Sequence, residues 1–259
     1  MRSMPKAKNL IIANWKANPD SQTEAKKLFL DTLKLLSGAG KAVKAVIAPP
    51  AVYLPVLKGL NRGSLVSLGV QDVSKFERGS HTGEITAKSA ADFSDYAIVG
   101  HSERRQTGEK NIDVAAKVAL SLKAGLIAVL CVGESKRDEG GDYLDFLREQ
   151  ITESLAGAPK SRIKKLIMAY EPVWAIGGEE AVAPSQIYET SIFIKKILGD
   201  IYGPSAAETP VIYGGSVTAK NASELKDAEG IEGLLVGHES LRAANFASIV
   251  RIFGNKNGN

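Results

Sequence analysis

One carboxylate in this chain stands where a base for carbon chemistry would be needed. Glu171 follows an apolar segment that begins at Ile163, and Pro172 directly after it disfavours helical backbone, so Glu171 is expected at the carboxyl end of a strand. An aromatic residue, small residues and the pair Gly177-Gly178 come next and predict a mobile loop. A positioned base beside a lid that excludes water suits proton abstraction from carbon. The alternative is an ordinary solvated glutamate in a loop.

Polar and glycine-rich motifs follow most other apolar segments in the same way. They are Asn14-Trp15-Lys16, Gln71-Asp72, Gly100-His101-Ser102-Glu103, Gly133-Glu134-Ser135, Gly214-Gly215-Ser216 and Gly237-His238-Glu239-Ser240. Proton abstraction beside a carbonyl builds negative charge on oxygen, which a cation and a neutral imidazole can stabilise. Lys16 and His101 are the candidates, and a helix starting after His101 would favour a neutral ring.

The elements that must position these residues alternate regularly. Eight apolar segments of strand length are separated by longer segments of helical period. The expected strands cover residues 10–13, 43–48, 65–70, 96–99, 126–132, 163–169, 210–213 and 231–236. Continuous apolar strands are buried on both faces, which indicates a parallel sheet covered by helices. Amphipathic helices are expected over residues 21–36 and 187–198.

Eight βα units favour one closed (β/α)8 barrel over an open doubly wound sheet. No G-x-G-x-x-G motif follows the first strand, which also disfavours a dinucleotide-binding fold. We expect a single domain over residues 1–259, with residues 1–8 as a flexible tail. Such barrels carry their active sites at the carboxyl ends of the strands, and phosphate often binds after strands 7 and 8.

Composition excludes several classes of function. The chain is 44% apolar and 24% charged with a net charge of +4, and its basic residues lie beside acidic ones, so no nucleic acid partner is expected. We find no signal peptide before Asn9 and no segment near the roughly 20 apolar residues of a membrane span, so we expect a cytoplasmic protein. The single Cys131 rules out an intrachain disulfide and is expected to be a buried structural thiol. The three histidines lie in different loops, so no metal site is expected. No cofactor is expected either.

Taken together and in order, these motifs resemble the triosephosphate isomerase family over residues 9–253. The segments that carry the resemblance are Asn14-Trp15-Lys16, Thr82-Gly83-Glu84, Val99 to Arg105, Cys131 to Glu134, Ala169 to Gly177, and Tyr213 to Val217. The resemblance implies a TIM barrel that interconverts dihydroxyacetone phosphate and D-glyceraldehyde 3-phosphate through an enediol(ate) intermediate. It places the enzyme in glycolysis and gluconeogenesis.

The resemblance also implies roles for individual residues. Glu171 corresponds to the base and His101 to the electrophile that shuttles a proton between the substrate oxygens. Lys16 and Asn14 correspond to residues that hold the substrate oxygen. Ser102 and Glu103 are supporting residues, of which Glu103 is expected to orient Lys16. Main-chain N–H groups would hold the phosphate, and they belong to Gly177, Ser216, Gly237 and His238.

A homodimer is implied as well. The segment from Val73 to Gly83 is too long to be only a connection between a strand and a helix. In the family this loop docks into a second copy, where the residue matching Thr82 supports the partner's Asn14 and Lys16.

Three places in the chain depart from the family pattern. The lid reads Gly177-Gly178-Glu179-Glu180 where Gly-Thr-Gly-Lys is usual, the phosphate loop reads Gly237-His238 where two glycines are usual, and Asp72 replaces the common asparagine. These changes leave open an isomerase of a four-carbon ketose phosphate, or a barrel that has lost efficient catalysis and serves as a binding or regulatory protein. The presence of Asn14, Lys16, His101 and Glu171 favours an active enzyme.

Overall fold

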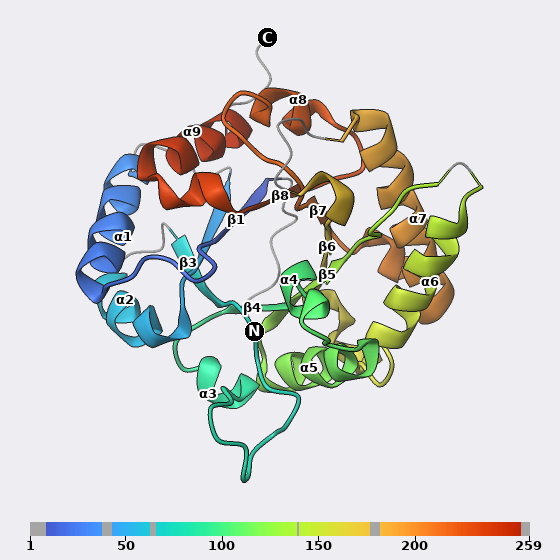
Figure 1. Cartoon of the computed structure of the whole chain (residues 1–259), viewed down its shortest axis with the longest axis horizontal. Helices are drawn as coiled ribbons and strands as arrows, with labels where there is room; N and C mark the ends of the chain where they lie inside the picture. Colours follow the sequence, from blue (N-terminus) through green and yellow to red (C-terminus); the bar gives the residue numbers. More distant parts are fainter. Residues whose placement is uncertain (1–8, 38–42, 63–65, 139, 177–181, 255–259) are drawn as a thin grey trace.

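Eight parallel strands close into a ring at the centre of the molecule (Figure 1). The structure is a computed structural model that describes residues 9–37, 43–62, 66–138, 140–176 and 182–254. The strands are β1 (Leu10–Asn14), β2 (Lys44–Ala48), β3 (Val66–Val70), β4 (Tyr96–Val99), β5 (Ile127–Val132), β6 (Leu166–Tyr170), β7 (Val211–Tyr213) and β8 (Gly233–Val236). Each strand pairs with the next in the chain, and β8 pairs with β1. The expected (β/α)8 barrel is therefore confirmed. Residues 1–8, expected as a flexible tail, lie outside the described residues.

Both faces of the strands are buried, as continuous apolar strands require. One group of buried side chains comes only from strands and fills the barrel interior, with Ile12, Ile98 and Ile212 among its members. The alternate strand positions, such as Ile11, pack outward against helix residues that include Phe29. The barrel is thus a solid core whose strand ends alone are available for a site.

Helices surround the barrel on its outside (Figure 1). They are α1 (Gln22–Leu36), α2 (Leu54–Leu60), α3 (Ala87–Ala90), α4 (Ser102–Gln106), α5 (Asn111–Ala124), α6 (Asp142–Ser154), α7 (Pro184–Tyr202), α8 (Ala222–Asp227) and α9 (Ala243–Gly254). Helix α1 starts where Ser21 Oγ accepts a hydrogen bond from Glu24 N at 3.2 Å. Within the part of the chain that the structure describes, no helix is long and apolar enough to cross a membrane.

The sixth strand begins later than the hydrophobic pattern predicts. Residues Lys160–Lys165 form a 3₁₀ turn, and β6 starts only at Leu166. Basic side chains of this turn bind the carboxyl end of α5, with Arg162 Nη1 3.0 Å from Leu122 O and Lys165 Nζ 2.6 Å from Gly125 O. Leu122 O also accepts from Gly125 N at 3.1 Å, so Arg162 adds a second hydrogen bond to it, and Lys165 binds the carbonyl group of the C-cap residue Gly125. Ile163 is buried, but it belongs to the 3₁₀ turn and not to the sheet.

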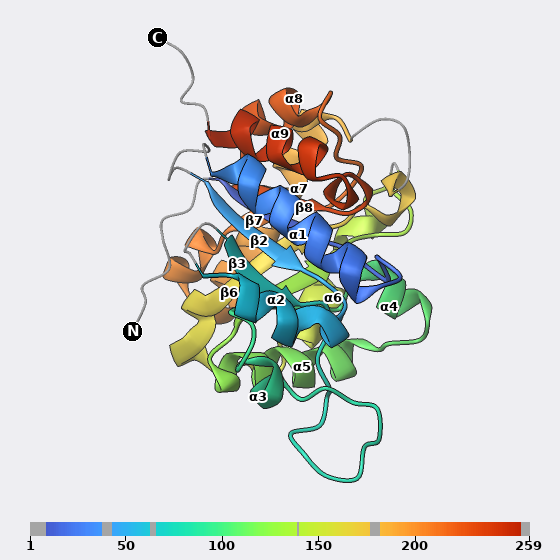
Figure 2. The same ribbon diagram turned by 90° about the vertical axis from the view of Figure 1, so that its left-hand side faces the viewer.

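The connection between β3 and α3 projects from the body of the barrel (Figure 2). Its base is closed by a hydrogen bond from Ser74 N to Ile85 O at 2.7 Å. The rings of Phe76 and His81 stack within it at a centroid distance of 3.5 Å. The loop is therefore locally ordered although most of its residues are exposed.

Candidate active site

The carboxyl ends of β1, β4, β6, β7 and β8 surround one cavity of about 300 Å³. It is lined by Asn14, Lys16, His101, Glu171, Ile176, Gly214, Gly215, Ser216, Val217, Thr218, Leu235, Gly237, His238 and Glu239. The four candidate catalytic residues and three of the four candidate phosphate-binding residues thus share one site. Gly177, the fourth, lies outside the described residues, as do Gly178, Glu179 and Glu180 of the lid.

Glu171 stands directly after β6 and is 2% exposed. Its Oε2 accepts a hydrogen bond from Ser102 N at 3.0 Å, and its Oε1 lies 3.1 Å from His101 Nε2. The main chain is fixed by Glu171 N donating to Val132 O at 2.8 Å. A Cβ at Gly133 would come within 1.8 Å of the Glu171 carbonyl oxygen, so only glycine permits this approach. The carboxylate is therefore buried, oriented and adjacent to an imidazole.

His101 follows β4 and a tight turn at Gly100, whose φ is +69°. The residue caps α4, and its Nδ1 accepts a hydrogen bond from Glu103 N at 3.2 Å. A ring nitrogen that accepts a hydrogen bond carries no proton, so the proton of the neutral ring lies on Nε2. Nε2 points at Glu171 Oε1 and can donate to an oxygen in the cavity. The geometry matches a neutral, proton-donating imidazole.

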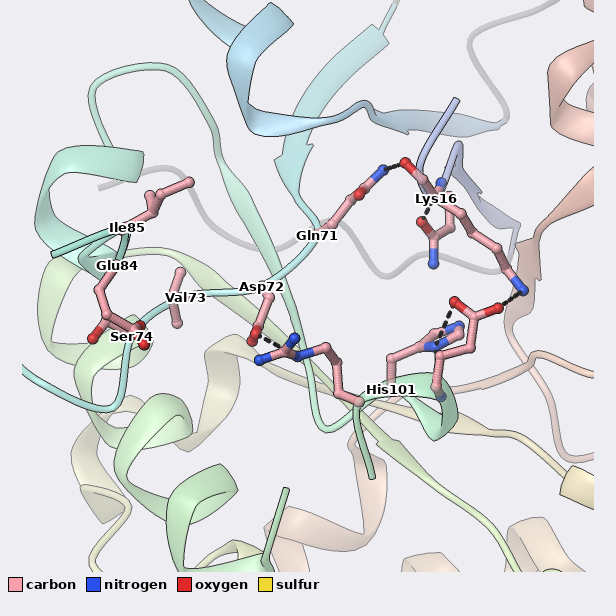
Figure 3. Close-up of a pocket in the computed structure, with 12 residues that line it drawn as sticks. Lys16, Gln71, Asp72, Val73, Ser74, Glu84, Ile85 and His101 are labelled. Atoms are coloured by element: carbon pink, nitrogen blue, oxygen red, sulfur yellow. Dashed lines mark hydrogen bonds and ion pairs between the residues drawn. The ribbon is translucent and has the colours of Figure 1, made fainter. Parts of the chain in front are cut away.

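Lys16 enters the site from the end of β1 (Figure 3). Its Nζ lies 2.5 Å from Glu103 Oε1, and its main-chain N donates to Asn14 Oδ1 at 3.0 Å. The Lys16 side chain is about one third exposed and lines the cavity. The ion pair with Glu103 fixes the position of its ammonium group. A cation, an amide and an imidazole therefore line the same cavity.

The end of the cavity near β7 and β8 contains the residues expected to bind phosphate, together with an acidic side chain. Ser216 and Gly237 line it, and a 3₁₀ turn, His238–Leu241, begins there. Glu239 also lines the cavity, where its Oε2 accepts from Asn245 Nδ2 at 2.6 Å. Glu239 belongs to the motif that follows the eighth strand, but the sequence predicts no role for it.

A second residue without an assigned role, Glu134, binds the residues on either side of Glu171. Glu134 is 1% exposed, and its Oε1 accepts hydrogen bonds from Tyr170 Oη and Trp174 Nε1, both at 2.9 Å. Burial, and then the charge of Glu134, raises the pKa of Tyr170 well above its usual range. Through these two hydrogen bonds Glu134 fixes Tyr170, which precedes Glu171, and Trp174, which follows it. Its position in a polar motif at the end of β5 is the signal that could have found it.

Cys131 lies beneath the site and is fully buried. Burial, followed by the charge of Glu171, raises the pKa of its thiol well above the usual value. The thiol is therefore protonated at neutral pH and unsuited to nucleophilic attack. This fits the structural role expected for it.

Thr82 is exposed in the projecting loop. Near the base of that loop, a cavity of about 350 Å³ is lined by Asn14, Lys16, Gln71, Asp72, Val73, Ser74, Gly83, Glu84, Ile85, His101, Glu103 and Arg104 (Figure 3). Asn14, Lys16 and His101 thus line both cavities. Among the described residues, no cluster of three or more histidine, cysteine, aspartate or glutamate side chains could hold a metal ion.

The sequence profile of triosephosphate isomerase matches residues 9–253 of this chain. The chain belongs to the triosephosphate isomerase family. This match confirms the family that the motifs indicated, and with it the barrel fold and the enzyme class.

Individual members of the triosephosphate isomerase family agree over nearly the full length. The triosephosphate isomerase of Dehalococcoides mccartyi is 39% identical, covering 93% of this chain and 96% of that protein. The one from Rhizobium meliloti is 36% identical, covering 96% and 97%. The crystal structure of triosephosphate isomerase from Bartonella henselae superposes with a TM-score of 0.82 at 31% identity, covering 95% of this chain and 99% of that chain.

Proposed function

We propose that this triosephosphate isomerase interconverts dihydroxyacetone phosphate and D-glyceraldehyde 3-phosphate, with Glu171 as the base and no cofactor. The observation that carries the proposal is the 3.1 Å approach of Glu171 Oε1 to His101 Nε2 on a cavity that Lys16 and Asn14 also line. A base, a proton shuttle and a cation in one small cavity are the groups that an enediolate route needs.

The steps follow from the positions of these groups. The Glu171 carboxylate takes the proton from the carbon beside the substrate carbonyl, and the electron pair moves onto the carbonyl oxygen. Nε2–H of His101 donates to that oxygen, while Lys16 and Asn14 stabilise the charge. His101 then recovers a proton from the neighbouring hydroxyl, and Glu171 returns its proton to the adjacent carbon. Phosphate bound at Ser216, Gly237 and His238, with Gly177 from the lid, would keep the substrate in place.

A second candidate is the isomerisation of a four-carbon ketose phosphate. It is favoured by His238 and Glu239, which place two titratable side chains on the cavity where backbone alone would suffice for phosphate. A coupled assay with glyceraldehyde 3-phosphate, run beside erythrulose phosphates, tests both candidates. We expect higher kcat/KM with the triose phosphate. A kcat/KM for an erythrulose phosphate at least tenfold above that for the triose would replace the first proposal by the second.

The imidazole of His238 is proposed to turn toward the phosphate. A bound dianion favours the protonated ring, so substrate affinity should weaken as pH rises through the usual histidine range. We expect KM to rise more between pH 6 and 8 for the wild type than for His238→Gly, at fixed ionic strength. Parallel curves for the two proteins would show that the ring points away.

We further propose a homodimer in which residues 73–83 of one copy enter the 350 Å³ cavity of the other. The projection of this loop from the barrel supports the proposal, as does the exposure of Ile85 (39%), which lines the cavity. Thr82 would then support the partner's Asn14 and Lys16. Cys131, as a reduced thiol, suits the cytoplasm as the proposed location.

Replacing residues 76–82 by a short glycine-rich linker should give monomers. Without the partner's loop, Asn14 and Lys16 lose a support, and a misplacement of about 1 Å can lower kcat/KM by about 10²-fold. Analytical ultracentrifugation at micromolar concentration, circular dichroism and the coupled assay measure mass, fold and activity. A folded monomer with wild-type kcat/KM would refute a role of the partner in the site, and a wild type that sediments as a monomer would refute the dimer.

A further inference from the structure

Lys16 adopts a backbone conformation that its side chain disfavours. Its φ is +52°, in the left-handed region, and among the described residues only Asn9 is another non-glycine residue with a positive φ. Asparagine tolerates this region, whereas a long side chain does so at a cost. Such a conformation persists only when surrounding contacts hold it. Contacts from neighbouring strands must therefore hold Lys16 in place.

The carboxamide of Gln71 holds the peptide that follows Lys16 (Figure 3). Gln71 Nε2 donates to Lys16 O at 2.9 Å and to Ala48 O at 2.8 Å. Ala48 O accepts a second hydrogen bond, from Trp15 N at 3.0 Å. One amide group therefore ties the end of β1 to the end of β2, on either side of the strained residue.

Gln71 is itself anchored through its neighbour Asp72. Both carboxylate oxygens of Asp72 lie 2.7 Å from Lys117 Nζ, and Oδ2 lies 3.0 Å from Arg104 Nε. The side chain of Lys117 is 6% exposed, and it also pairs with Glu109. These pairs attach the end of β3 to α4 and α5, so the Gln71 amide is presented from a fixed support.

We propose that Gln71 is a positioning residue for Lys16. The inference rests on the proposed function, in which Lys16 stabilises the charge on the substrate oxygen. When the bond from Gln71 to Lys16 O is lost, the following peptide can rotate and φ of Lys16 can return to negative values. That rotation redirects Cα–Cβ and carries the ammonium away from Glu103 and the cavity. The two hydrogen bonds require two N–H donors on one nitrogen. Glutamate and methionine have no such group.

Gln71→Met is expected to lower kcat/KM by about 10-fold to 10²-fold, the effect of a displaced catalytic group. Gln71→Glu should lower it at least as much, because a carboxylate would face two carbonyl oxygens. The matched control is Asn61→Met, which removes an amide bond to a main-chain carbonyl, Val66 O at 3.1 Å, at the amino end of β3. It should change kcat/KM by less than twofold.

A double-mutant cycle with Lys16→Met separates positioning from general support. In the Lys16→Met background, Gln71→Met should change kcat/KM by less than twofold, because the group it positions is absent. Thermal unfolding and sedimentation of all four proteins show whether fold and mass are kept. An equal loss in both backgrounds, or a loss under twofold in the wild type, would overturn the inference. If Lys16→Met alone leaves kcat/KM unchanged, the proposed role of Lys16 fails instead.

Discussion

Glu171→Gln should lower kcat by about 10²–10⁴-fold, the usual contribution of a positioned base. Glutamine has the shape of glutamate, and its amide oxygen can still accept the hydrogen bond from Ser102 N. It cannot accept a proton from carbon at neutral pH. The fold and the cavity should therefore survive while proton abstraction is lost, and kcat should fall far more than KM rises. Steady-state kinetics in both directions measure the effect.

A partly buried glutamate at the opposite end of the barrel, Glu232, supplies the control. Glu232 precedes β8, accepts from Val211 N at 2.7 Å and pairs with Lys195 Nζ at 2.6 Å. Glu232→Gln also replaces a hydrogen-bonded carboxylate by its amide, but away from the site, so kcat should stay within twofold of the wild type. Near-normal turnover of Glu171→Gln would remove Glu171 from the mechanism. An equal loss in the two variants would mean that lost structure, not lost chemistry, was measured.

His101→Gln should lower kcat by about 10²-fold, at the lower end of the range for proton transfer catalysis. The amide of glutamine can donate a hydrogen bond to a substrate oxygen, as Nε2 of His101 can. It cannot give up a proton to one oxygen and take one from the other. The variant should therefore still bind substrate while the intermediate forms and resolves slowly. Solvent isotope exchange into remaining substrate, together with kcat and KM, follows these steps.

The control is the second histidine of the cavity. Val236-Gly237-His238 repeats the sequence of Val99-Gly100-His101, but its histidine follows β8 instead of β4. His238→Gln should change mainly KM and leave kcat within about tenfold, because uniform binding affects KM. A larger loss of kcat in His238→Gln than in His101→Gln would show that His238, and not His101, is the histidine that transfers the proton.

The amino-acid sequence by itself determined the class of the fold and the place of the chemistry. Apolar segments without alternation imply strands buried on both faces, which a parallel barrel covered by helices provides. Because parallel strands end on the same side, motifs that follow the strands were expected on one face, and Lys16, His101 and Glu171 line one cavity there. This pattern depends only on local composition and chain direction, which a sequence contains.

The tertiary structure alone decided how these groups are held. The bonds from Ser102 N to Glu171 and from Gln71 to Lys16 O join residues that are 69 and 55 positions apart in the chain. Their geometry depends on strand register and on how each helix seats on the barrel, which no local pattern encodes. The late start of β6 has the same origin, because Arg162 and Lys165 bind the end of α5. The positive φ of Lys16 likewise becomes visible only when the ends of β1, β2 and β3 meet, since long-range hydrogen bonds, not residue type, stabilise it.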